Sequence, residues 1–77
     1  MKTAYIVYET DQNLQNKQIV GVFTAKSKAL KEVFTQIENV EGEISTWQID
    51  FIENNMQSQG LDTNYIISEQ ETNIIFN

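Results

Sequence analysis

Catalysis by this sequence would have to rest on carboxylates, lysines or tyrosines, because histidine and cysteine are both absent. Their absence excludes an imidazole base, a thiolate nucleophile and the usual nitrogen and sulfur ligands of metal sites. Asp50 and Glu53 could form an acid and base pair, and Glu69 and Glu71 would share one face of an extended segment. In a chain with eleven acids such spacings are common, and solvated surface carboxylates are the favoured interpretation.

Two ligand-binding motifs begin in the sequence without being completed. The run from Asp11 starts like a calcium loop, but its sixth position is Asn16 instead of glycine and its twelfth is Val22 instead of glutamate. The three glycines are isolated, and none of them belongs to a phosphate-binding Gly-Lys-Ser or Gly-Lys-Thr motif. We therefore predict a protein without catalytic residues, metal ion or cofactor, and an enzyme is the least favoured class.

The charge is distributed unevenly along the chain. Residues 1–31 hold all five lysines and two acids, a net charge of +3, whereas residues 32–77 hold nine acids and no base, a net charge of −9. A domain with a total charge of −6 is repelled by nucleic acid and by anionic membranes, and it is attracted to basic protein surfaces. We expect no direct nucleic-acid or membrane binding, although the acidity could also serve solubility alone.

The length of 77 residues predicts a single small domain over residues 1–77, with a small core. The lack of cysteine favours the cytoplasm, because very small secreted domains usually depend on disulfides. The first apolar run, from Tyr5 to Tyr8, is too short for a signal peptide or a membrane span.

Residues 3–9 and Gln18 to Thr24 are rich in β-branched and aromatic residues, which predicts two strands. The connection between them is short and polar, so we expect an antiparallel hairpin. Gly21 within the second strand indicates a bulge or a close backbone approach.

An amphipathic helix is predicted from a Thr24 cap to about Asn39, followed by Gly42 as its end. Its apolar residues follow the three-and-four spacing of a core-facing stripe. The stripe comprises Ala29, Leu30, Val33, Phe34, Ile37 and Val40.

The second half of the chain is predicted to add three strands. Trp47, Ile49 and Phe51 alternate with polar residues, the period of a half-buried strand. After a polar loop over residues 54–64, Tyr65–Ile67 and Ile74–Phe76 are predicted to form a terminal hairpin. The sequence thus predicts an α+β domain of order ββαβββ, with an antiparallel sheet of four to five strands and one helix on one face.

The first half of the sequence has two further recognisable runs, Tyr5-Ile6-Val7-Tyr8 and Gly21-Val22-Phe23-Thr24, the second of which enters a lysine-led helix. Through these runs it resembles small uncharacterised proteins of phages and mobile elements. In size and acidity the chain is similar to phage inhibitors of host defence, including anti-CRISPR proteins. That resemblance implies a partner with a basic groove, such as a nucleic-acid-binding effector.

Two functions follow as hypotheses. The first is an acidic inhibitor that occludes a basic groove by charge and bulk. Its candidate binding residues are Glu38, Glu41, Glu43, Asp50, Glu53, Asp62, Glu69 and Glu71. The second is an interaction or assembly module, a homodimer or an accessory subunit, that uses a strand edge and aromatics such as Tyr5, Tyr8 or Trp47.

Overall fold

The computed structural model describes residues 2–72, which form an antiparallel sheet and two helices, and it confirms the predicted α+β class. The elements in chain order are β1 (Lys2–Thr10), β2 (Gln18–Phe23), α1 (Lys26–Glu41), α2 (Thr46–Asn55) and β3 (Asn64–Thr72). Within these residues the sheet has three strands in the order β2-β1-β3, with β1 in the centre. The predicted order ββαβββ with four to five strands is not confirmed.

The predicted hairpin of the first two strands is confirmed. β1 pairs antiparallel with β2, with Tyr5 opposite Phe23 and Tyr8 opposite Ile19. The register shifts next to Val7, where β2 holds the extra residue Val20, so the bulge expected near Gly21 is present. A β-carbon on Gly21 would lie 3.0 Å from the ring of Phe23, so the glycine also leaves room for that ring.

β3 is longer than the predicted strand over Tyr65–Ile67. It pairs with β1 along its whole length, from Thr10 opposite Asn64 to Lys2 opposite Thr72. Residues 68–72, predicted as part of a turn, therefore continue the strand. The other strand of the predicted terminal hairpin, Ile74–Phe76, lies outside the described residues.

Helix α1 is confirmed with corrected ends. The predicted Thr24 cap is wrong, because the cap residue is Ala25 and no side chain caps the helix start. Alanine has no hydrogen-bonding side chain, so the free amides of the first turn lack a side-chain acceptor. The helix runs two residues beyond Asn39, to Glu41, and Gly42 ends it in the left-handed conformation with φ 87°.

Helix α2 replaces the strand predicted around Trp47, Ile49 and Phe51. Its start carries a capping box: the Gln48 amide donates to Ser45 Oγ at 3.3 Å, and the Ser45 amide donates to Gln48 Oε1 at 2.9 Å. These two hydrogen bonds give two backbone amides their acceptors and so stabilise a helix start at this point. The alternation of apolar and polar residues that predicted a strand covers only a short segment. The prediction of a strand here is therefore wrong.

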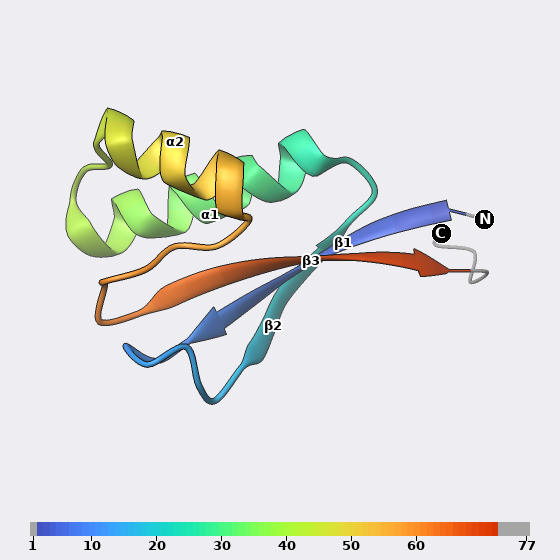
Figure 1. Cartoon of the computed structure of the whole chain (residues 1–77), viewed down its shortest axis with the longest axis horizontal. Coiled ribbons are helices and arrows are strands. Elements are labelled where there is room, and N and C mark those ends of the chain that lie inside the picture. Colours follow the sequence, from blue (N-terminus) through green and yellow to red (C-terminus); the bar gives the residue numbers. More distant parts are fainter. Residues whose placement is uncertain (1, 73–77) are drawn as a thin grey trace.

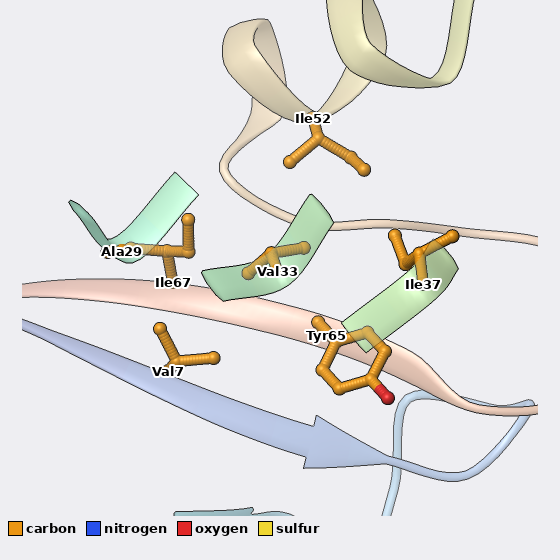
Figure 2. Close-up of a cluster of buried hydrophobic side chains, with 7 residues drawn as sticks. All are labelled: Val7, Ala29, Val33, Ile37, Ile52, Tyr65 and Ile67. Atoms are coloured by element: carbon orange, nitrogen blue, oxygen red, sulfur yellow. The ribbon is translucent and has the colours of Figure 1, made fainter. Parts of the chain in front are cut away.

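Both helices lie on the same side of the sheet (Figure 1). α1 packs across all three strands, and α2 packs against α1. The core between these layers is a cluster of seven buried side chains, and Figure 2 shows the Tyr65 ring with its hydroxyl directed away from the others. The cluster comprises Val7, Ala29, Val33, Ile37, Ile52, Tyr65 and Ile67.

Candidate protein-binding surface

The eight carboxylates predicted to bind a partner are all exposed, and they come from five parts of the chain. Glu38 and Glu41 belong to α1, Glu43 follows it, and Asp50 and Glu53 belong to α2. Asp62 lies in the loop before β3, and Glu69 and Glu71 lie in β3 itself. We use the name acidic helical surface for the five acids from Glu38 to Glu53, which occupy one helical hairpin.

The outer side of α2 presents a tryptophan in line with two acids. Trp47, Asp50 and Glu53 are spaced by three residues, so they are neighbours on the helix surface. Trp47 is 65% exposed, although tryptophan is usually largely buried. An apolar anchor with carboxylates beside it is the arrangement found in protein interfaces, where an apolar centre has a polar rim.

The end of α1 also presents an exposed apolar side chain beside two acids. Val40 is 60% exposed and lies between Glu38 and Glu41 in the last turn of the helix. The junction from Gly42 to Ser45 brings this turn to the start of α2, and the two lie at the same end of the molecule (Figure 1). Val40 was predicted to be part of the core stripe, and its exposure corrects that prediction because the stripe is buried only as far as Ile37.

Glu69 and Glu71 lie apart from the acidic helical surface. They belong to the half of β3 that pairs with the start of β1, and this end of the sheet is opposite to the α1–α2 junction (Figure 1). The Tyr5 hydroxyl donates to Glu69 Oε1 at 3.3 Å. Partial burial raises the pKa of Tyr5, and the charge and hydrogen bond of Glu69 raise it further. This pair has a local structural role across the two strands.

A shallow hollow beside Trp47 has about 190 Å³ of empty space. Its lining includes Trp47, Phe51 and Leu61, from α2 and the loop that follows it. This space includes open solvent, and its enclosed part is about the size of one water molecule. The hollow is therefore a shallow depression on the outer side of α2.

A buried polar cluster next to this hollow was not foreseen from the sequence. Asn64 is 0% exposed, and its amide group bridges Ser58 and Leu61: Ser58 Oγ donates to Asn64 Oδ1 at 3.0 Å, and Asn64 Nδ2 donates to the Leu61 carbonyl at 2.9 Å. Ser58 Oγ also accepts from the Tyr65 amide at 2.9 Å. With both hydrogen-bonding roles of Ser58 occupied and no histidine in the chain, the cluster fixes the loop and offers no nucleophile.

Asp11, the first residue of the incomplete calcium motif, binds its own loop. Its Oδ1 accepts from the amides of Asn13 and Gln15 at 2.9 Å each, and its Oδ2 accepts from Asn16 Nδ2 at 2.8 Å. The Gln15 amide is the largest cause of the lowered pKa of Asp11, and Asn13 and Asn16 add to it. Within residues 2–72 no group of three or more acids is arranged to hold a metal ion.

Neither helix in the described part of the chain has the length and apolar character needed to cross a bilayer. No protein-family model matches this chain, and neither the curated proteins nor the solved structures yield a match.

Proposed function

We propose that this chain is a non-catalytic domain that docks its acidic helical surface on a basic protein surface and excludes nucleic acid from it. The observation that carries the proposal is the 65% exposure of Trp47 in line with Asp50 and Glu53 on α2. The absence of any base after residue 31 supports it, because the whole helical hairpin from Glu32 onwards carries one sign of charge.

Trp47 is suited to anchor such a complex. Tryptophan is enriched among the few residues that dominate binding energy, and these residues are usually surrounded by contacts that exclude water. Its ring face also attracts lysine and arginine side chains, which are the groups that a basic surface presents. A partner side chain could lie over the shallow hollow between Trp47 and Leu61 while Asp50 and Glu53 pair with basic side chains around it.

The inhibitory effect follows from shared charge. Nucleic acid binds proteins largely through basic side chains that contact its phosphates, and the acidic helical surface would compete for the same side chains. Complementary charge of this kind accelerates association and is weakened by salt. The resemblance to phage inhibitors of host defence is consistent with a nucleic-acid-handling protein as the target.

The test uses the immobilised full chain and a bacterial lysate at about 0.05 M and about 0.5 M salt, which span the range in which surface charges become screened. Three variants are compared with the parent: Trp47→Ala, the pair Asp50→Asn with Glu53→Gln, and the control pair Glu69→Gln with Glu71→Gln. The two double variants remove the same charge from two separate elements, α2 and β3. Any captured protein is then purified, and its nucleic-acid binding is measured with and without the chain.

We expect a captured protein to be released by salt and to lose nucleic-acid binding when the chain is added. Trp47→Ala and the α2 double variant should each weaken its affinity at least about tenfold, equivalent to about 1.4 kcal/mol, while the β3 double variant leaves it within about twofold. Capture that is equally strong at both salt concentrations, or an affinity that falls equally in both double variants, would contradict docking through the acidic helical surface.

A further inference from the structure

The side of the sheet opposite the helices carries a group of apolar residues, with the polar Ser68 and Gln70 beside them toward the end of β3. The register places Ile6, Tyr8, Ile19, Val22 and Ile66 on this side, because residues directly opposed in an antiparallel pair share a face. We call these five residues the open face. Ile19 is 63% exposed and Val22 is 46% exposed, and no element of the described residues covers them.

The sequence of β1 is typical of a strand that is buried on both sides. Antiparallel strands with one solvated face alternate apolar and polar residues, whereas strands covered on both faces have continuous apolar runs. β1 holds the unbroken run Ala4 to Tyr8, and Ile66 and Ile67 extend the same feature to β3. Packing against the helices explains why Val7 and Ile67 are apolar. A second layer on the other side of the sheet would explain why Ile6 and Ile66 are apolar too.

None of the eleven acids lies on the open face. Glu9, Glu69 and Glu71 are on the helix side by register, Asp11 and Asp62 are in loops, and the others belong to the helices or the turn between them. A positive group borders the face instead, since Lys17 Nζ lies 5.9 Å from the centre of the Tyr8 ring. A molecule with a charge of −6 therefore meets no carboxylate here, and the nearby lysine attracts it.

We propose that a second copy of this chain covers the open face, with the two sheets packed face to face about a twofold axis. A copy of the same chain suits this surface, because a face without carboxylates avoids repulsion between two molecules that each carry a charge of −6. Sheets pack in this way at about 10 Å, with the side chains of both inner faces interdigitated. The result is a four-layer arrangement of helices, two sheets and helices.

The area of this side of the sheet limits how strong the dimer can be. The nine residues of β1 span about 30 Å, and three strands about 4.8 Å apart are about 14 Å wide, which gives at most about 400 Å² per copy. Stable complexes usually bury about 800 Å² per partner. We therefore expect a weak dimer that forms at high concentration and dissociates on dilution.

Sedimentation velocity of the full chain from about 10 µM to about 1 mM tests the proposal in a range suited to weak association. The key variant is Ile19→Lys, and its matched control is Val40→Lys, because both residues are aliphatic, 60% or more exposed and on opposite sides of the molecule. Circular dichroism verifies that each variant is folded. If Ile19→Lys is unfolded, the measurement is repeated with Val22→Thr, which is a smaller change on the same face.

We expect the parent to shift from monomer to dimer over this range, Ile19→Lys to raise the dimer dissociation constant at least about tenfold, and Val40→Lys to change it less than about threefold. Added salt should strengthen the dimer, since it screens the repulsion between two acidic chains, whereas it weakens binding to a basic partner. The two proposals therefore fail separately. A parent that stays monomeric over the whole range, or equal effects of both lysine variants, would overturn the dimer.

Discussion

The two faces of the sheet are built from the same kinds of residues, yet only one of them forms the core. Ile67 is 5% exposed beneath the helices, whereas Ile19 on the open face is 63% exposed. The difference comes from α1, which crosses one side of all three strands. Apolar composition therefore identifies surfaces that can be buried, and the arrangement of the helices decides which of them is buried within one chain.

The largest effect should come from comparing Ile67→Ala with Ile66→Ala, neighbouring isoleucines on opposite faces of β3. Removing the buried side chain of Ile67 leaves a cavity in the core and should lower the free energy of unfolding by about 2–5 kcal/mol. The half-buried Ile66 should cost about 1 kcal/mol or less in the monomer. Urea denaturation at low protein concentration measures both, and similar losses would contradict the distinction between the faces.

The buried polar cluster around Asn64 allows a test of whether hydrogen bonds, as well as apolar contacts, stabilise the helix side of the sheet. Asn64→Ala would leave Ser58 Oγ and the Leu61 carbonyl without their partner, and we expect a loss of about 1–3 kcal/mol. The matched control is Asn55→Ala, because the Asn55 side chain makes an exposed hydrogen bond to the Phe51 carbonyl. The control should change the free energy of unfolding by less than about 0.5 kcal/mol, and an equal effect at both sites would contradict a special role for Asn64.

The two helices of the covering layer differ at their starts. Ser45→Ala removes the cap of α2 and should cost about 1 kcal/mol. Ala25→Asp supplies a cap to α1 and places a negative charge at its positive end, so we expect a gain of about 1 kcal/mol. Thr24→Ala serves as the control, with little change in the thermal midpoint, and a clear loss there would restore the cap predicted from the sequence.

The smallest effect should come from Asp11, in the loop that joins β1 to the strand at the sheet edge. Because its folded pKa is lowered below the ordinary value of 3.8, ionised Asp11 stabilises the fold above that pH, and this contribution is lost as the pH falls through the lowered pKa. Asp11→Asn should therefore be less stable than the parent at neutral pH. The difference should vanish in acid, and denaturation curves of both proteins below and above about pH 4 measure it.

The sequence predicts the local elements of this fold better than their long-range arrangement. The β1–β2 hairpin, the Gly21 bulge and the Gly42 end of α1 each depend on neighbouring residues, and all three are confirmed. The strand predicted at Trp47 is wrong because an alternation of only three apolar residues is too short to distinguish a strand from a helix. The capping box of Ser45 and Gln48 was the available signal for that helix.

The remaining features depend on contacts far apart in the sequence. Residues 68–72 are polar and show no strand periodicity, and they are extended because β1 pairs with them. The exposure of Trp47 and the burial of Asn64 follow from how α2 and its loop meet the rest of the molecule. The acids were identified from composition, but their separation between the helical hairpin and β3 required the fold.

The central position of β1 has a consequence for how the protein is made. Residues 2–10 leave the ribosome well before residues 64–72, which form one of their two pairing partners. Until that segment emerges, the hairpin of β1 and β2 has an unpaired inner edge and two uncovered apolar sides, a state that favours association with other nascent chains or with chaperones. Closing the sheet also requires a loop of more than 50 residues between β1 and β3, so we expect folding to be slow for a chain of this length.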